Sequence, residues 1–512
     1  MLRRHLSRLE SYWRALFALA AGLLTLFAFA PYSFYPFAVL GPALLFLLWL
    51  DATPRQALAE GWSFGIGLLG FGVFWMHISI DQFGNVGTVL AMLITLLFII
   101  AVSGFYGLAG WLGRRLMANA RPAVLLILVF PLTWVLGEWL RGWFLTGFPW
   151  LALGYSQIDS LLSGFAPVFG VYGVSLAVAV SSGLLVLAYS DRRIEPLMAL
   201  VLAIVIWGDG YLLGRVQWTE DTGETLKVSL IQGNIDQAEK WKRENLESTL
   251  ALYRDLSRES RESDVIIWPE TAVPAFLHQL DETFLTPLEE EFQAQESQGK
   301  KSALLMGIPV WQPEGKHYYN ALLALDGERD EYYKRHLVPF GEFMPLKSLI
   351  GPLLEWIEIP MSDFSAGAAV RPLIRLAGRP VGVSICYEDA FGEEMIQALP
   401  DAQYLVNVSN DAWFGDSLAL PQHLEIARMR ALETGRYLLR STNTGISALI
   451  DQRGQLMGRS PKFQQHVLSG DIQAMQGMTP YARYGNWLVV AFSVAGLLLT
   501  LIICRYRNCR HT

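Results

Sequence analysis

Hydrophobic and polar positions divide this chain of 512 residues into two kinds of sequence. Long apolar runs fill most of residues 15–213 and recur near the C-terminus, whereas residues 215–485 alternate short apolar runs with charged stretches. Because about 20 helical residues are needed to cross about 30 Å of hydrocarbon, each long run is a candidate membrane helix. The pattern predicts eight such helices, at residues 13–30, 35–50, 60–80, 87–112, 123–140, 164–189, 195–213 and 487–504.

The first apolar run also has features of a secretory signal peptide. It follows Arg3 and Arg4 and ends in the small-residue pattern Ala28-Phe29-Ala30. However, Pro31 would follow the cut, and the arginines suit an anchor that is not cleaved. We therefore interpret this run as the first membrane helix.

Basic residues between the apolar runs predict which side of the membrane each connection faces. Outside residues 215–485 there are fourteen basic residues, all arginine, and thirteen of them fall in alternate connections or at the termini. Because positive charges are retained on the cytoplasmic side, we expect both termini in the cytoplasm and residues 215–485 outside. The thirteen are Arg3, Arg4, Arg8, Arg14, Arg55, Arg114, Arg115, Arg121, Arg192, Arg193, Arg505, Arg507 and Arg510.

Residues 215–485 are expected to form a separate domain, between helices in 1–214 and a last helix with a short tail in 486–512. Short apolar runs that alternate with helical stretches are typical of a layered α/β domain. This segment holds 26 Lys and Arg against 38 Asp and Glu, which argues against a nucleic-acid partner. The expected strands are 226–234, 264–270, 302–310, 320–326, 331–342, 380–388 and 402–410, and the expected helices are 244–261, 282–298 and 420–437.

One cysteine, Cys386, lies in this domain, whereas Cys504 and Cys509 follow the last apolar run. The domain therefore cannot form an internal disulfide. An unpaired thiol in an oxidising compartment is a liability unless it is buried or used in chemistry. Cys386 is therefore either a small buried apolar residue or a nucleophile.

Three predicted strands end in residues that suit covalent catalysis. Glu270, Lys334 and Cys386 each lie at or near the end of an apolar run, where α/β sheets place their sites. Glu270 could take the thiol proton, Lys334 could stabilise the thiolate and an oxyanion, and Glu342 could hold the lysine. Taken singly, these residues could instead be a helix cap, a surface charge and its salt-bridge partner.

The contexts of these residues resemble the nitrilase, or carbon–nitrogen hydrolase, superfamily. "WPE" at 268–270, "K…HLVPFGE" at 334–342 and "CYE" at 386–388 match that family's Glu–Lys–Cys triad in chain order. Seven helices before the domain and one after it are similar to bacterial apolipoprotein N-acyltransferases. Further stretches that resemble this family are 138–157, 232–241, 336–346, 409–417 and 427–447.

The resemblance implies an α-helical transmembrane bundle joined to an extracytoplasmic nitrilase-like αββα sandwich. It implies a multi-pass protein of the bacterial inner membrane with a periplasmic catalytic domain, working as a monomer among membrane lipids. The implied reaction moves an acyl chain from a phospholipid, typically phosphatidylethanolamine, to the α-amino group of a diacylated apolipoprotein. It passes through a thioester on Cys386 and uses no cofactor and no metal.

Several other residues are expected to support this reaction. The Tyr387 backbone N–H could complete an oxyanion hole, and the resemblance implies orienting roles for Tyr387 and Glu388. Trp241 follows a strand end and would contact substrate, with a core aromatic as the alternative. Trp413 and Phe414 could line the path of the acyl chain, although aromatics and glycines are also common in plain loops.

Two features near the membrane allow two interpretations each. Arg141 breaks the pattern of cytoplasmic charge, lies three residues from Glu138, and is either its salt-bridge partner or a contact for a lipid phosphate. Residues 343–366 are too apolar for an ordinary loop. They are either a lid that screens the thioester and admits lipid, or a cover packed on a strand edge.

Two rival functions remain at this point. A membrane-anchored carbon–nitrogen hydrolase would use the same three residues and release its product to water, but a soluble substrate needs neither eight helices nor an apolar arm. A transporter or sensor predicts charged or broken helices at the membrane midplane. Apart from His77, we find no ionisable residue well inside a predicted span.

Overall fold

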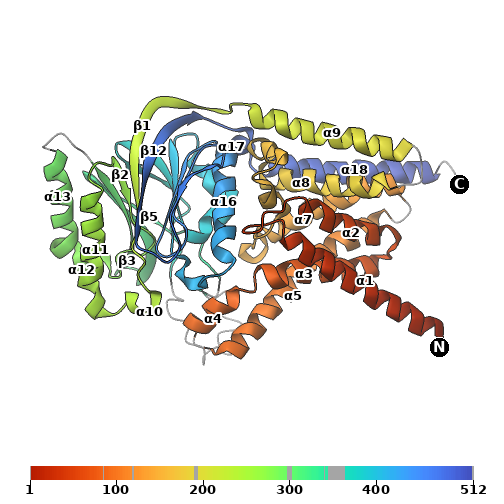
Figure 1. Cartoon of the computed structure of the whole chain (residues 1–512), viewed down its shortest axis with the longest axis horizontal. Coiled ribbons are helices and arrows are strands. Elements are labelled where there is room, and N and C mark those ends of the chain that lie inside the picture. The colour runs from red at the N-terminus through yellow and green to blue at the C-terminus, as the bar shows by residue number, and fades with distance from the viewer. Residues whose placement is uncertain are drawn as a thin grey trace. The chain divides into compact units, whose positions relative to one another are not determined.

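The computed structural model describes residues 2–84, 86–117, 120–189, 194–296, 302–339, 341–343 and 364–509. The chain forms two compact units. The helical unit comprises Met1–His77, Thr88–Val216 and Tyr484–Thr512, and the sheet unit comprises Ile78–Gly87 and Gln217–Arg483. Figure 1 labels the elements of both units.

The helical unit contains a helix at each apolar run. Within the described residues, five helical segments are long and apolar enough to cross a membrane, and α3 with α4 would add a sixth span if the 57° bend between them lies within one span. Two shorter apolar helical segments, Ser11–Leu26 and Phe37–Asp51, precede them. The elements are α1 (Leu2–Leu26), α2 (Phe37–Asp51), α3 (Pro54–Gly72), α5 (Thr88–Leu116), α6 (Pro122–Val124), η1 (Leu125–Val129), α7 (Phe130–Arg141), η2 (Phe144–Thr146), η3 (Leu153–Gln157), η4 (Leu161–Phe165), α8 (Ala166–Ala188), α9 (Ile194–Arg215) and α18 (Trp487–Cys509), and α4 is Met76–Gly84.

Glycines let helices α1 and α3 approach each other closely. A Cβ atom on Gly67 would collide with the backbone carbonyl of Leu19, and one on Gly22 would collide with that of Phe64. In lipid there is little hydrophobic force between helices, so close backbone packing through small residues supplies much of their attraction. The two glycines therefore set the separation of this helix pair.

We expect Gly67→Ala to destabilise the helical unit, because the new methyl group must push α1 away. Overpacking of this kind costs about 1–3 kcal/mol. The measurement is the melting temperature of the protein in detergent. Gly70→Ala is the matched control on the same helix, since its Cβ would meet nothing nearer than Ile66 Cγ2 at 4.0 Å. Equal melting temperatures for the two variants would contradict this account of the packing.

The sheet unit is built on two sheets, each with six strands among the described residues. One has the order β12-β1-β2-β3-β4-β5 and the other β11-β10-β9-β8-β7-β6, and each has three parallel strands at its centre, β1-β2-β3 and β9-β8-β7. The strands are β1 (Thr219–Gln232), β2 (Val265–Ile267), β3 (Ala303–Gln312), β4 (His317–Asp326), β5 (Glu328–Tyr333), β6 (Leu373–Leu376), β7 (Arg379–Ile385), β8 (Tyr404–Ser409), β9 (Leu438–Thr442), β10 (Ala448–Ile450), β11 (Leu456–Arg459) and β12 (His466–Gly477).

The side chains of these strands are buried on both faces. Along β3, Leu305 belongs to the apolar core shared with the other sheet, whereas Leu304 and Met306 pack with side chains from the helices α11 (Leu246–Glu259) and α13 (Thr286–Glu296). Helix α16 (Ala419–Thr434) lies on the other side of the paired sheets (Figure 1). The sheet unit is therefore the expected αββα sandwich. Its remaining helices are α10 (Gln237–Lys240), η5 (Arg243–Asn245), α12 (Leu277–Leu280), η6 (Asp281–Leu285), η7 (Cys386–Ala390), α15 (Gly392–Met395), η8 (Ile396–Ala398), η9 (Asp411–Phe414) and α17 (Pro480–Tyr484).

One predicted strand is wrong over most of its length. The apolar pattern predicted a strand over 331–342, but β5 ends at Tyr333. Beyond it the chain turns, because Pro339 has no N–H to donate and the N–H groups of Gly341 and Glu342 bond back to Val338. The prediction also missed β6 and the strands from Leu438 to Gly477.

Candidate active site

The predicted nucleophile, base and lysine all lie just beyond the ends of strands. Glu270 follows β2, Lys334 follows β5, and Cys386 begins the short helix η7 directly after β7. Glu270 and Lys334 thus come from one sheet and Cys386 from the other. All three side chains are at most 9% exposed, so the packing of the two sheets brings them together in a site with little water.

Lys334 lies between two carboxylates. Its Nζ is 2.8 Å from Glu342 Oε1 and 3.6 Å from Glu270 Oε1. Burial disfavours the charge, but Glu342, Glu270 and Cys386 together raise the lysine pKa well above its ordinary value. The lysine is therefore a fixed positive charge, and Glu342 is its nearer carboxylate partner.

The Glu270 carboxylate is fixed on both oxygens. Asn320 Nδ2 donates to Glu270 Oε1 at 2.7 Å, and the backbone N–H of Asn410 donates to Oε2 at 2.9 Å. The same Asn320 amide reaches Glu342 Oε1 at 3.2 Å. Strand β3 approaches so closely that a Cβ on Gly307 would lie 2.5 Å from Pro269 O. The carboxylate therefore has little freedom to turn away from its neighbours.

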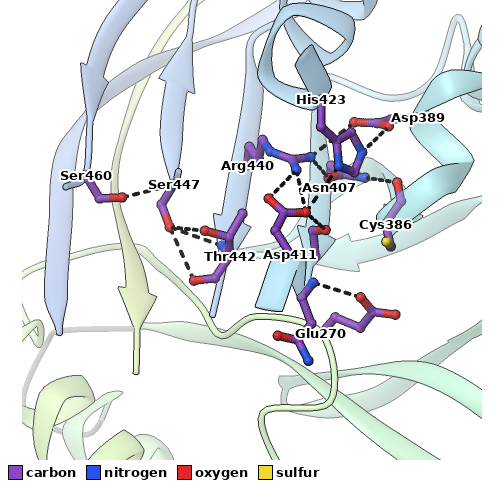
Figure 2. A network of polar contacts seen from close by, with 12 residues as sticks. Glu270, Cys386, Asp389, Asn407, Asp411, His423, Arg440, Thr442, Ser447 and Ser460 are labelled. Atoms are coloured by element: carbon purple, nitrogen blue, oxygen red, sulfur yellow. Dashed lines mark hydrogen bonds and ion pairs between the residues drawn. The ribbon is translucent and has the colours of Figure 1, made fainter. Parts of the chain in front are cut away.

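Cys386 adopts a backbone conformation that is rare for residues other than glycine, with φ of +53°. This conformation begins the tight η7 turn. Burial raises the pKa of the thiol, Glu270 and Asp411 add to this effect, and Lys334 opposes it. The thiol is therefore protonated at rest, and ionisation requires a base. Figure 2 shows the sulfur and the Glu270 carboxylate on the same side of the polar network around η7.

Glu388 joins the nucleophile turn to the segment that carries the lysine. Its Oε1 accepts the N–H groups of Arg335 and His336, and its Oε2 accepts the N–H of Ile385. The Tyr332 hydroxyl donates to the same carboxylate. Burial raises the pKa of Glu388, and the N–H donors oppose this effect. The carboxylate therefore fixes Lys334 relative to Cys386 without contacting either reacting group.

The remaining predicted residues in the sheet unit lie at its surface or near it. Trp241 is 40% exposed, so it is not a core aromatic. Trp413 and Phe414 are half-buried in η9, and the Trp413 ring packs edge-on against Phe83 of α4 at 4.4 Å between centroids. Tyr387 is half-buried beside Phe391. A role for these four residues in substrate binding or oxyanion stabilisation stays a prediction.

Arg141 is buried within the helical unit. Its Nη1 donates to the Trp150 carbonyl at 2.6 Å, and its guanidinium lies over the Tyr106 ring. Glu138 accepts from Trp134 Nε1 and from the Leu153 N–H. In this arrangement Arg141 supports the backbone after α7, and a contact with a lipid phosphate stays a prediction.

Several residues of the site were not predicted from the sequence. Asn320 and Asn410 hold the Glu270 carboxylate, and buried Lys240 donates to Glu270 O at 3.3 Å and to Thr271 Oγ1 at 2.7 Å. The signal for Asn410 was present, because it directly follows the apolar run of β8, as Glu270 follows that of β2. Among the described residues, no group of three or more His, Cys, Asp and Glu side chains could hold a metal ion.

We expect Glu388→Gln to disturb the site while preserving its shape. The amide nitrogen would face backbone N–H groups that now donate to a carboxylate, and each unsatisfied buried donor costs about 1–3 kcal/mol. The protein should melt at a lower temperature and lose about tenfold or more in activity. Glu282→Gln, which changes an exposed carboxylate of the same unit, is the control. Wild-type activity in Glu388→Gln would contradict the joining role.

Lys240 gives the stability a predictable pH dependence. Burial lowers its pKa to about 7, against the attraction of Glu270. Above about pH 7, Lys240 is deprotonated in the folded chain, whereas in the unfolded chain it stays protonated up to about pH 10.4. Wild-type stability relative to Lys240→Met should therefore rise between about pH 7 and about pH 10. Thermal unfolding in detergent at several pH values tests this, with exposed Lys242→Met as the control; a constant difference would contradict it.

Comparisons with known proteins agree with this fold and show the family of the chain. Residues 21–184 match the family model described as the apolipoprotein N-acyltransferase N-terminal domain, and residues 227–481 match the carbon-nitrogen hydrolase model. The apolipoprotein N-acyltransferase of Methylococcus capsulatus is 46% identical over 96% of both chains. That of Nitrosomonas europaea is 43% identical over 96% of this chain and 97% of its own, and that of Coxiella burnetii is 39% identical over 95% and 99%. The chain belongs to the apolipoprotein N-acyltransferase family.

Proposed function

We propose that the protein transfers an acyl chain from phosphatidylethanolamine to the α-amino group of the diacylglyceryl-cysteine that begins an apolipoprotein. The observation that carries this proposal is the convergence of Glu270, Lys334 and Cys386 from two sheets in a chain of this family. The thiol supplies a nucleophile, the glutamate a base, and the lysine a positive charge for the oxyanion. No cofactor takes part in the proposal.

The first half of the reaction forms the acyl-enzyme. Glu270 takes the proton of Cys386, and the sulfur attacks the ester carbonyl of the phospholipid. Lys334 and the Tyr387 backbone N–H stabilise the oxyanion that forms. The intermediate then expels the lysophospholipid, whose oxygen receives the proton from Glu270. The raised thiol pKa supports a proton transfer coupled to attack, because a free thiolate is disfavoured in this buried site.

The second half passes the acyl chain to the lipoprotein. The α-amino group attacks the thioester, Glu270 takes a proton from the attacking nitrogen, and Lys334 again faces the oxyanion. Collapse of this intermediate forms the amide and returns the proton to the sulfur of Cys386. The two products leave at different stages, so the mechanism is ping-pong.

Other predicted residues are assigned to substrate binding and shielding in this proposal. Trp241, Trp413, Phe414 and Arg141 would contact lipid. The predicted arm, 343–366, lies mainly outside the described residues, next to a hydrogen bond from the Phe364 N–H to Glu342 O at 3.0 Å. Its role as a lid that screens the thioester from water stays a prediction from its apolar sequence.

We also propose a location and topology. The protein lies in the bacterial inner membrane as a monomer, with both termini cytoplasmic and residues 215–485 in the periplasm. Helices in 1–214 and the last helix in 486–512 anchor the catalytic domain. The helices that are long enough to cross a membrane and the placement of the arginines support this proposal.

The test is the intact mass of the purified protein after incubation with phosphatidylethanolamine in the absence of any lipoprotein. We expect a gain of one acyl chain on Cys386, which hydroxylamine removes because it cleaves thioesters. Cys386→Ala should gain nothing. Glu270→Gln should acylate about 10²–10⁴ times more slowly, which is the usual contribution of a general base.

The same measurement separates the transferase from its rival. A membrane-anchored carbon–nitrogen hydrolase would release free fatty acid, or act on a soluble amide, without needing an acceptor. Free fatty acid that accumulates without an adduct would therefore favour the hydrolase. An unmodified protein with no turnover would contradict phosphatidylethanolamine as the donor.

A further inference from the structure

A cluster of four charged side chains lies behind the nucleophile turn and takes no part in the proton transfers proposed above. It consists of Asp389, Asp411, His423 and Arg440, each at most 2% exposed. They come from η7, η9, α16 and β9, all on the side of the second sheet. Figure 2 shows His423 and Arg440 between the two aspartates. Burying four charged side chains carries a large desolvation cost, which their mutual contacts must offset.

His423 faces a carboxylate with each of its ring nitrogens. Its Nε2 lies 2.9 Å from Asp389 Oδ1, and its Nδ1 lies 3.2 Å from Asp411 Oδ1. An ionised carboxylate only accepts hydrogen bonds, so both ring nitrogens must donate. A neutral imidazole has one donor and one acceptor, whereas the imidazolium has two donors. The geometry therefore fits the charged form of the histidine.

Arg440 supplies the second positive charge. Its Nη1 lies 3.3 Å from Asp389 Oδ2, and its Nη2 lies 3.0 Å from Asp411 Oδ2. With His423 charged, two positive and two negative groups cancel. Burial and Arg440 lower the pKa of His423, but Asp389 and Asp411 raise it above its ordinary value. Burial raises the pKa of Asp411, but Arg440 and His423 bring it below its ordinary value.

The cluster is joined to both reacting groups. Arg440 Nη1 donates to Asn407 Oδ1 at 2.6 Å, and Asn407 Nδ2 donates to the Cys386 carbonyl at 3.1 Å. Asp411 directly follows Asn410, whose N–H holds Glu270 Oε2. Asp389 belongs to the same short turn as Cys386. The four charges therefore connect the strained turn of the nucleophile to the loop that holds the base.

We propose that His423, as an imidazolium, is a positioning residue for Cys386: it ties the η7 turn to the 409–411 loop and keeps the buried cluster electrically neutral. A neutral histidine would leave one uncancelled negative charge near a sulfur that must itself become anionic. The sulfur would then lose its proton less readily, and Glu270 would be held less firmly. The proposal deepens the proposed function, on which its catalytic consequence rests.

The test uses the full-length protein and three variants. His423→Asn leaves the cluster with a net charge of −1, and Asp389→Asn/His423→Asn restores neutrality without the imidazolium. His278→Asn, at an exposed histidine of the same unit, is the matched control. Two rates are measured from pH 6 to 10: alkylation of Cys386 by iodoacetamide, located by peptide mass, and formation of the acyl-enzyme from phosphatidylethanolamine. The alkylation rate does not depend on the lipid reaction, so it tests the histidine even if the proposed donor is wrong.

We expect His423→Asn to alkylate Cys386 about tenfold more slowly near neutral pH, with its rise in rate shifted about one unit to higher pH. The double variant should recover most of this loss. In the wild type, acylation should decline at alkaline pH as His423 loses its proton, and this decline should be absent from the double variant.

Three results would overturn the proposal. One is a His423→Asn protein with the rates and pH dependence of the wild type. Another is a folded double variant that reacts no faster than the single variant, because neutrality would then be irrelevant. The third result concerns folding. If His423→Asn does not fold, the electrically neutral double variant should still fold and react. A double variant that is as unstable as His423→Asn would contradict the proposal.

Discussion

A lysine ammonium removed from water needs anionic partners, and Lys334 has them in Glu342 and Glu270. These ion pairs determine how the site is arranged, because a buried charge without a partner would cost several kcal/mol. The lysine can stay charged only while the segments after β2 and β5 meet, and Asn320 holds both carboxylates in that place. The same positive charge is the group that makes an anionic sulfur or oxygen tolerable nearby.

The site residues come from two sheets, and each sheet holds its own site residues through its own polar contacts. On one sheet, Lys334, Glu342, Glu270 and Asn320 form their own network of hydrogen bonds and ion pairs. On the other, the cluster around Arg440 supports the turn of Cys386. The links between them are short and specific, chiefly the Asn410 N–H on Glu270 and the bonds of Glu388. The relative position of Cys386 and Glu270 therefore depends on a few buried hydrogen bonds and on the apolar core between the sheets.

The α/β layering was predicted from the alternation of short apolar runs and helical stretches, and the fold confirms it. Glu270, Lys334 and Cys386 were singled out because a reactive side chain at the end of an apolar run stands out, and their catalytic roles stay a prediction. The sequence did not allow the residues around them to be predicted. Lys240, His423 and Arg440 look like surface charges in the sequence, and only the folded chain shows that they are buried. The strand expected over 331–342 failed for a related reason: periodicity does not reveal where Pro339 and a side-chain bond from Glu342 turn the chain.

The left-handed backbone of Cys386 has a consequence for how the protein can be handled. A side chain at φ of +53° stores about 1–2 kcal/mol that glycine would not. The residue proposed as the nucleophile is therefore held in a strained backbone conformation. Cys386→Gly would lack the thiol and relieve this backbone strain, but it would also lose the packing of a buried side chain in the core between the sheets. Such a molecule would suit the capture of the donor lipid of the proposed reaction, because no thiol is present to accept the acyl chain.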